Sequence, residues 1–393
     1  MISRRTILGG LAATTAAGAG AGLLARTAGA APAGPAPAGA AAAGLPLRID
    51  NRTGRYANTA VWIYIVGNVG GQQVRVTPQG EVKPIALGDN RPDGFTDYAM
   101  PLAANGITTL RIPRMSGRIY ASLGSKLKFK AVKDGNGKAA LAYPAGWVSG
   151  DPNYQIVHDC AEFTYDQSGM HCNTTSVDMF SVPMSIRLTG ARDQTAGALK
   201  AGARSRIFSE IGRTPGFGKL VVGDKRVIAP SHGLDSGLFD RNYLAPYIDR
   251  AWNAYTSKDL KVTTNAGTFT GRVSGSQFTF RGPAQFSIAK PSTRDVLFCD
   301  GALLAPNDGL KGPVAAVLGA ALNRATLADH AGQPTTNAGT FYKGQLANHY
   351  ARVLHAEAAD GKAYGFAFDD VANFASYIED GAPREMTLTL TPF

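Results

Sequence analysis

The chain is poor in the residue types that carry most metal and thiol chemistry. It has three cysteines and six histidines in 393 residues, and no Cys-x-x-Cys pair occurs. Zinc sites and thioredoxin-type chemistry are therefore disfavoured. His349 and His355 lie six residues apart on a predicted helix, a spacing that does not place them on one face. We therefore expect neither a metal site nor a cofactor.

Other common signatures are also missing. No run beyond the N-terminal leader approaches the roughly 20 apolar residues of a membrane span, so we expect none. There is no Gly-x-Ser-x-Gly elbow, and Ser231-His232-Gly233 has no partner that the sequence identifies, which disfavours a serine hydrolase. Lysines and arginines form no dense stripe with interleaved aromatics, so we expect no nucleic-acid partner.

The first 30 residues are typical of an export leader rather than of a folded domain. Ser3-Arg4-Arg5-Thr6-Ile7-Leu8 resembles a twin-arginine n-region, and Ala28-Gly29-Ala30 offers a cleavage site between small residues. A membrane anchor is the less favoured alternative, because the segment is short and poor in Leu, Ile and Val. Residues 31–44 form an Ala/Pro-rich linker. We expect a secreted, extracellular protein, and a monomer.

The remaining chain is basic. The formal charge is +11, and removal of Arg4, Arg5 and Arg26 with the leader lowers it by three to +8. Such a charge favours adsorption to anionic surfaces such as cell walls. A simply solvated basic surface explains it equally well.

The order of the predicted elements indicates two lobes. Residues 45–189 contain many short β-branched and aromatic runs separated by turn residues, as in a β sandwich or barrel. Residues 190–360 mix helical and strand patterns, and residues 361–393 return to β. We therefore predict a mainly β protein with an inserted mixed α/β lobe. Two such lobes leave a cleft, the usual place for a ligand.

Individual elements follow from hydrophobic periodicity. Short runs predict strands, which include Thr108–Ile112, Gly117–Ser122, Leu127–Lys130, Glu162–Tyr165, Val177–Leu188, Leu260–Thr264, Phe269–Val273, Gln277–Phe280, Val296–Phe298, Ala363–Phe368 and Glu385–Thr391. Helices are predicted over Thr195–Ile211, Asp240–Ser257, Pro313–Leu327 and Thr340–Ala359.

Two carboxylates in apolar strands are the strongest chemical signal. Glu162 and Asp178 lie in neighbouring strand-like runs joined by the ten residues Asp166–Thr175, with Gly169 near the middle. A half-buried carboxylate is costly unless it is used or satisfied. A hairpin would present both to one cleft, as glycoside hydrolysis requires. Polar residues at strand ends or turns are the alternative, and for this pair the two interpretations weigh equally.

The distance between the two carboxyl groups decides whether hydrolysis inverts or retains the anomeric configuration, and sequence alone does not give that distance. An inverting pair is roughly 6.5–9.5 Å apart and a retaining pair about 5–5.5 Å. Strand register would settle the distance, and the sequence does not specify it.

Three cysteines in an exported chain allow at most one disulfide. Cys160 and Cys172 bracket Glu162 and are the favoured pair, which would pin the loop beside the carboxylate. Cys299 is then a buried free thiol, although a bond to Cys299 stays open.

The residues around the pair resemble the glycoside hydrolase family 64 β-1,3-glucanases of the laminaripentaose-producing type. The resemblance covers nearly all of residues 45–393. It is carried by Gly117–Tyr120, Glu162–Tyr165, Asn173–Phe180, Cys299–Gly301, Leu322–Arg324 and Tyr364–Val371. It implies a thaumatin-like β barrel or sandwich, with an α/β lobe that completes a wide groove.

The resemblance also implies roles for individual residues. Glu162 becomes the general acid, kept protonated by burial against Phe163, and Asp178 the general base of an inverting, endo-acting hydrolase of β-1,3-glucan. The predicted contacts to glucose hydroxyls are Thr164, Asp166, Asn173 and Thr175, and the predicted stacking aromatics are Trp147 and Tyr165. The alternatives are a non-catalytic thaumatin-like glucan-binding protein and a wall-associated structural or inhibitor protein.

Overall fold

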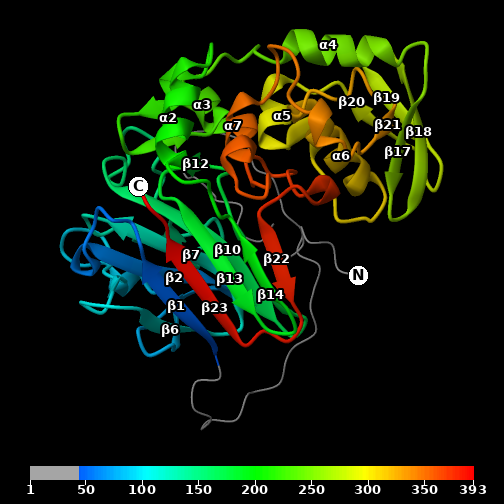
Figure 1. Ribbon diagram of the computed structural model, residues 1–393. Coiled ribbons are helices and arrows are strands. Elements are labelled where there is room, and N and C mark those ends of the chain that lie inside the picture. Colours follow the sequence, from blue (N-terminus) through cyan, green and yellow to red (C-terminus); the bar gives the residue numbers. More distant parts are fainter. Residues whose placement is uncertain (1–43) are drawn as a thin grey trace.

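The computed structural model describes residues 44–393 and shows two lobes, one above the other (Figure 1). The β lobe consists of two stacked sheets, and the α/β lobe comprises residues 197–376 together with β12 (Met179–Phe180). The predicted leader and residues 31–43 of the predicted linker lie outside the described residues. No helix in residues 44–393 combines the length and the apolar character that crossing a bilayer requires.

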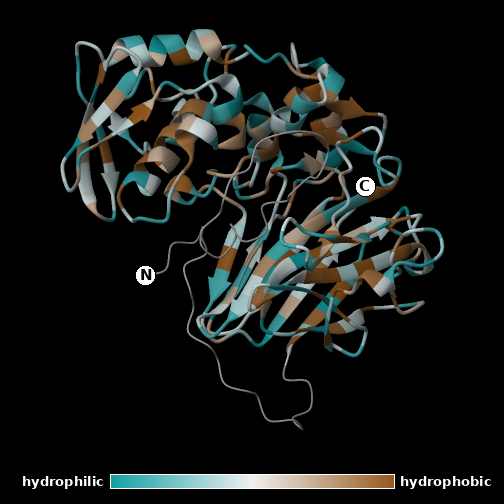
Figure 2. Cartoon of the chain, turned by 180° about the vertical axis from the view of Figure 1, so that it is seen from behind, coloured by the Kyte–Doolittle hydropathy of each residue, from teal (hydrophilic) through white to brown (hydrophobic). Residues whose placement is uncertain are grey.

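The β lobe is a sandwich whose strands each bury one face. Alternate residues of the two sheets form one apolar core between them, and Figure 2 shows hydrophobic and hydrophilic residues alternating along these strands. One sheet has the order β14-β13-β23-β1-β6, and the other β22-β11-β10-β7-β2-β3-β4 with β5 beside β2. The strands are β1 (Leu45–Asn51), β2 (Val61–Val69), β3 (Gln72–Val76), β4 (Val82–Pro84), β5 (Met100–Pro101), β6 (Thr108–Ile112), β7 (Met115–Leu123), β10 (Val157–Asp166), β11 (Gly169–Thr174), β13 (Met184–Thr189), β14 (Asp193–Ala196), β22 (Tyr377–Asp380) and β23 (Glu385–Leu390).

The first and last strands of the described chain are neighbours. β23 lies parallel to β1, with Leu47 opposite Met386 and Ile49 opposite Leu388, and all four side chains are buried. The chain leaves the sandwich after β14 and returns at β22. These two strands are edge strands that contact each other, and Gln194 donates a hydrogen bond to the carbonyl oxygen of Glu379 over 2.8 Å.

The α/β lobe packs its helices around a second apolar core. Helix α6 (Lys311–Asn323) is buried on nearly all sides, as its run of Ala, Val and Leu requires. The other helices of this lobe are α2 (Ala203–Arg213), α3 (Pro230–Asp235), α4 (Ala245–Ala254), α5 (Thr293–Phe298) and α7 (His349–Glu357). One of its sheets contains β17 (Leu260–Thr264), β18 (Gly267–Ser274), β19 (Gln277–Arg281), β20 (Phe286–Ala289) and β21 (Gly332–Gln333). In a second sheet β16 (Arg226–Ile228) lies between β12 and β15 (Val221–Val222) and pairs with both. A separate hairpin joins β8 (Lys130–Lys133) and β9 (Ala139–Ala142).

Four of the predicted strands are wrong. In Leu127–Lys130 only Lys130 lies in a strand, as the first residue of β8. Val177–Leu188 is interrupted, and only β12 and β13 form within it. Val296–Phe298 is the end of helix α5, whose start is capped by Ser292. A run of three apolar residues is too short to distinguish the repeat of a helix from that of a strand. Ala363–Phe368 contains no strand; it wraps around the buried carboxylate of Asp369, which accepts a hydrogen bond from the backbone of Gly365.

Candidate active site

Glu162 lies in the middle of a sheet and faces a polar neighbour on each side. On β10 it is directly opposite Arg118 of β7 and Asn173 of β11, and its side chain is only 11% exposed. Asn173 Nδ2 donates to Glu162 Oε2 over 3.4 Å. Phe163 points to the other face, into the core of the sandwich. The predicted burial of Glu162 against Phe163 is therefore wrong.

The hairpin after Glu162 is much tighter than expected. The predicted connection Asp166–Thr175 is wrong, because β11 occupies most of it and pairs with β10 from Asp166 opposite Gly169. The glycine adopts φ +118°, which the tight turn requires. Met170 and Cys172 alternate with polar residues and are buried. This alternation of buried and polar residues predicts a strand, but because most residues of the segment are polar, its composition favours a loop.

Asp178 is not on the strand that pairs with β10, contrary to prediction. It lies in a bend between β11 and β12, and its side chain is 28% exposed. Two contacts from the start of α3 hold it. The backbone N–H of Ala229 donates to its carbonyl oxygen over 3.0 Å, and His232 Nε2 lies 2.9 Å from Oδ1.

Arg118 joins the two carboxylates. Its Nη2 and Nε lie 2.9 and 3.1 Å from Glu162 Oε1, and its Nη1 lies 3.7 Å from Asp178 Oδ2. The Arg118 side chain is 13% exposed, so its charge acts with little screening by water. The carboxylates that the sequence singled out therefore lie on either side of one cation.

Asp178 is electrostatically prepared to act as a base. Burial raises the pKa of its carboxyl group, but the hydrogen bond from His232 and the charge of Arg118 outweigh burial and leave the pKa below its usual value. Asp178 is therefore ionised at neutral pH, as a group that accepts a proton from water must be.

The two predicted stacking aromatics do not present free faces. The indole of Trp147 stacks on His232, with ring centroids 4.3 Å apart and planes at 21°, and the residue is 9% exposed. Tyr165 points to the opposite side of the sheet from Glu162, beside the sandwich core and 5.7 Å from Arg114. Both predictions are corrected: Trp147 supports a histidine, and Tyr165 covers a core edge.

The four predicted polar contacts differ in where they lie. Thr164 follows Glu162 on the same face and donates to Ser116 over 2.9 Å. Thr175 lines a pocket beside Asp178. Asp166 caps the hairpin turn by accepting hydrogen bonds from Ser168. Asn173 is fully buried against Glu162, so the prediction that it contacts sugar is corrected.

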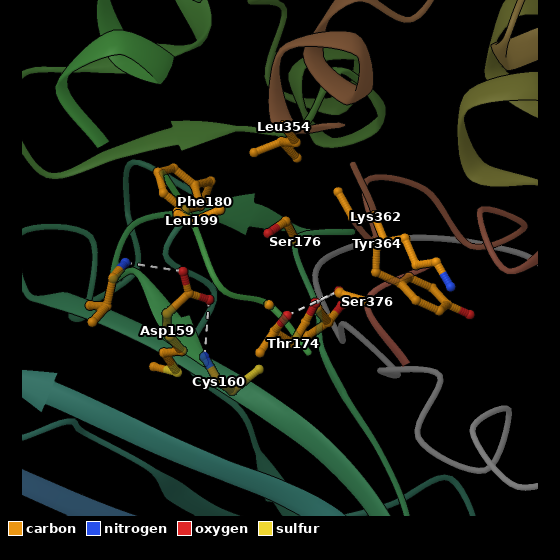
Figure 3. A pocket seen from close by; sticks show the side chains of 15 residues that line it. Asp159, Cys160, Thr174, Ser176, Phe180, Leu199, Leu354, Lys362, Tyr364 and Ser376 are labelled. Atoms are coloured by element: carbon orange, nitrogen blue, oxygen red, sulfur yellow. Dashed lines mark hydrogen bonds between the residues drawn. The ribbon is translucent and has the colours of Figure 1, made fainter. Parts of the chain in front are cut away.

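A second pocket is lined by Ser176 and Phe180, which flank Asp178 in the chain (Figure 3). Leu354 of α7 closes it on one side, and Thr174 and Ser376 join across it through a 3.0 Å hydrogen bond between their hydroxyls. Its walls share Asp159, Cys160 and Thr175 with the pocket beside Asp178. The backbone amides of Ser181 and Val182 donate to Asp159, which fixes the start of β13 against β10.

The predicted disulfide is wrong. Cys172 lies opposite Phe163 and packs in the sandwich core, whereas Cys160, three residues before Phe163, points to the other face. Side chains on opposite faces of a sheet cannot be bridged without moving the backbone. All three cysteines, Cys299 included, are buried thiols that form no disulfide with one another.

Two important residues were not assigned from the sequence. Arg118 lies in a strand segment that carried the family resemblance, and an arginine alternating with buried residues on a strand is the available signal. His232 was noted, but its partner is 54 residues away in the chain, and sequence spacing cannot identify such a contact. Residues 44–393 contain no group of three or more His, Cys, Asp or Glu side chains arranged to hold a metal ion.

Known proteins of one family resemble this chain over most of its length. The family described as β-1,3-glucanase, glycoside hydrolase family 64, matches residues 43–390. Glucan endo-1,3-β-glucosidases from Arthrobacter sp. (strain YCWD3) and Cellulosimicrobium cellulans are each 34% identical over 365 residues, which cover 89% of this chain and 65% of theirs. The chain thus spans about 65% of the length of these curated relatives.

Solved structures show the same fold. A laminaripentaose-producing β-1,3-glucanase in complex with laminaritetraose superimposes with a TM-score of 0.81 at 36% identity, over 89% of this chain and 99% of that one. A family 64 β-1,3-glucanase domain from Clostridium beijerinckii gives a TM-score of 0.78 at 28% identity, over 89% and 98%.

Proposed function

The chain belongs to glycoside hydrolase family 64, the β-1,3-glucanases. On that premise we propose that the protein cleaves internal bonds of β-1,3-glucan, with Glu162 as general acid and Asp178 as general base. The observation that carries the proposal is the pair of carboxylates on either side of Arg118, one nearly buried and one more exposed. The substrate class is supported by the names of the similar proteins.

The proposed reaction is a single displacement. Asp178 accepts a proton from a water molecule, whose oxygen attacks the anomeric carbon of the scissile bond. Glu162 transfers its proton to the glycosidic oxygen, which leaves with the bond electrons as the hydroxyl of the departing glucan. The anomeric centre inverts, and the proton taken up by Asp178 returns to Glu162 through solvent.

Arg118 holds both acids in place during this sequence. Its two contacts with one oxygen of Glu162 orient that carboxyl group and leave Oε2 to Asn173. Its longer contact with Asp178 is beyond hydrogen-bond distance, so the base keeps an oxygen for water. Positioning of this kind lowers the entropic cost of assembling water, acid and substrate.

Hydrolysis of laminarin or curdlan tests the proposal. We expect the wild type to release soluble oligosaccharides, and we expect Glu162→Gln and Asp178→Asn each to lower kcat by roughly 10²- to 10⁴-fold. Asp193→Asn is the matched control, because Asp193 pairs with Arg187 at an exposed edge of the sandwich. Near-normal activity in either active-site variant would remove that residue from the mechanism.

A glucan-binding protein without activity is the competing proposal. It would share the fold, and its acids would only contact sugar. Co-sedimentation with insoluble curdlan, run beside the activity assay, separates the two. Retained binding without any product from the wild type would favour the binding protein.

We also propose export of the protein by the twin-arginine route, on the strength of residues 1–30. Substitution of both Arg4 and Arg5 by lysine should leave the protein inside the cell. Unchanged secretion would contradict this route.

A further inference from the structure

His232 connects the carboxylate of Asp178 to the α/β lobe. Its Nε2 lies 2.9 Å from Asp178 Oδ1. Because an ionised carboxylate only accepts hydrogen bonds, Nε2 must carry the hydrogen and donate it. The reaction proposed above does not use this contact, since His232 neither gives a proton to the sugar nor takes one from water.

The imidazole is held in a fixed orientation. One face stacks on Trp147 at 4.3 Å, and the ring of Phe298 approaches at 5.6 Å with planes at 89°. The side chain is 15% exposed. Rings packed on two sides by aromatics have little rotational freedom, so the direction of the N–H bond is fixed before substrate arrives.

Two hydrogen bonds from the start of α3 therefore hold Asp178. Ala229 bonds to its backbone carbonyl, and His232, three residues later, bonds to its side chain. One carboxylate oxygen is thus occupied by His232. The other lies 3.7 Å from Arg118, which leaves it free to accept a hydrogen bond from water.

We propose that His232 is a positioning residue for Asp178, which occupies Oδ1 and so presents Oδ2 to the attacking water. This inference rests on the proposed function, because it assigns the histidine a part in the same reaction. Trp147 contributes indirectly, by holding the ring that holds the base. The role explains why a nearly buried indole lies beside a polysaccharide site without a free face.

Other titratable and charged groups also surround Asp178. They are Arg118 and Tyr120 from β7, His158, Asp159 and Cys160 from β10, and Tyr350 from α7. Burial raises the pKa of Tyr120, Cys160 and Tyr350 well above their usual values, so these three stay neutral near neutral pH. Arg118, which also pairs with Glu162, stays charged.

Asp159 and His158 also have pKa values shifted by their surroundings. Burial raises the pKa of Asp159 to about 7 and, reinforced by the charge of Arg226, lowers that of His158 to about 3. Both residues are present in the wild type and in every variant at position 232. A comparison of variants at that position therefore isolates the effect of the histidine.

Three substitutions test the role. His232→Phe keeps an aromatic ring between Trp147 and Phe298 but removes the donor. His232→Gln keeps an N–H donor without the ring. His349→Phe is the control, because His349 also contacts an aromatic ring, Phe217 at 5.7 Å, but on α7 and away from Asp178.

We expect His232→Phe to lower kcat on laminarin by about ten- to a hundredfold, the worth of a hydrogen bond to a charged group, with KM little changed. His232→Gln should recover much of that loss, and His349→Phe should match the wild type. Loss of a donor to the ionised form raises the pKa of Asp178. The acid limb of kcat/KM should therefore move to higher pH in His232→Phe. Wild-type kcat and pH profile in this variant would overturn the inference.

A second measurement works whether or not the protein hydrolyses laminarin. The ¹³C resonance of the Asp178 carboxyl group, assigned by its disappearance in Asp178→Asn, is titrated in wild type and in His232→Phe. We expect a higher pKa in the variant, and an unchanged pKa would overturn the inference. A shifted pKa in a protein that releases no oligosaccharide would support the histidine's hold on Asp178 and refute the proposed function.

Discussion

The backbone N–H of Ala229 donates to the carbonyl oxygen of Asp178 over 3.0 Å, across the boundary between the two lobes. The neighbouring β12 also pairs with β16 of the α/β lobe. Glu162, in contrast, is held by Arg118 and by a strand of the sandwich. Asp178 is thus anchored to both lobes, whereas Glu162 is anchored to the sandwich alone, so the packing between the lobes contributes to their separation.

The first prediction concerns stereochemistry. If Asp178 activates water while Arg118 lies between the carboxylates, the sugar released at the new reducing end must have the α configuration. ¹H NMR of laminarin digests within the first minutes, before mutarotation, measures the anomer. A digest with a known retaining β-glucanase serves as the control. Initial formation of the β-anomer would make Asp178 a nucleophile.

A second prediction concerns the stability of the Arg118–Glu162 pair. Both side chains are nearly buried, so removing Arg118 leaves Glu162 without the two contacts to its Oε1 and the ionised Asp178 without its neighbouring cation. We expect Arg118→Met to lower the free energy of unfolding by about 3–5 kcal/mol. The double variant with Glu162→Gln should lose much less than the sum of the single losses.

Urea unfolding of the four proteins measures this coupling. The exposed pair Arg187–Asp193 is the matched control, since its side chains are 57% and 55% exposed. Its double-mutant cycle should show little coupling. Additive losses at Arg118 and Glu162 would contradict the prediction.

A third prediction concerns a buried ion pair in the α/β lobe. Asp369 is fully buried and accepts hydrogen bonds from Arg324 and from His355, both at 3.0 Å. Burial lowers the pKa of His355, but Asp369 outweighs it and raises the pKa above its usual value. Burial raises the pKa of Asp369, but His355 and Arg324 outweigh it and lower the pKa.

The two shifts define a pH window for stability. The contribution of His355 is fully present below its unfolded pKa of about 6.5 and is lost as pH rises through the higher folded value. That of Asp369 is present above about 3.8 and is lost as pH falls through its lower folded value. His355→Gln should therefore cost most, about 1–3 kcal/mol, between roughly pH 4 and 6.5. Urea titrations across pH test this, with His330→Gln at a partly exposed histidine as control; a pH-independent cost would contradict it.

A fourth prediction concerns the thiols. Cys160, Cys172 and Cys299 are buried and form no disulfide with one another. Burial raises the pKa of Cys160 and Cys172, which suppresses the reactive thiolate. We expect no fast reaction of the native protein with Ellman's reagent and three reactive thiols after denaturation, with or without prior reductant. Fewer than three thiols in the unreduced sample would show that a disulfide forms.

Much of the fold was predictable because its strands alternate. Thr108–Ile112 and Leu260–Thr264 are strands with the predicted bounds, since each buries every second residue against a core. The prediction of a strand at Val296–Phe298 was wrong because three apolar residues fit both the helical and the strand repeat. The cap at Ser292, upstream of this run, is what marks the segment as a helix. Local pattern determines a strand only where the pattern is long enough.

The candidate site was predictable in composition but not in arrangement. Glu162 and Asp178 were recognisable as costly carboxylates in apolar surroundings. The contacts of Asp178 with Ala229 and His232 span more than 50 residues of sequence, and no local periodicity encodes them. Trp147 was misassigned for the same reason, because its stacking partner comes from the other lobe.

The α/β lobe is joined to the sandwich by four chain connections: two at the adjoining edge strands β14 and β22, and two at β12, which lies between β11 and β13 in the chain. Asp178 lies in the connection from β11 to β12, and just after β12 the backbone amides of Ser181 and Val182 are bonded to Asp159 of β10. Four connections restrict relative motion of the lobes more than the two of a simple insertion. The gap between base and acid is therefore fixed by the folded chain before a polysaccharide strand enters it.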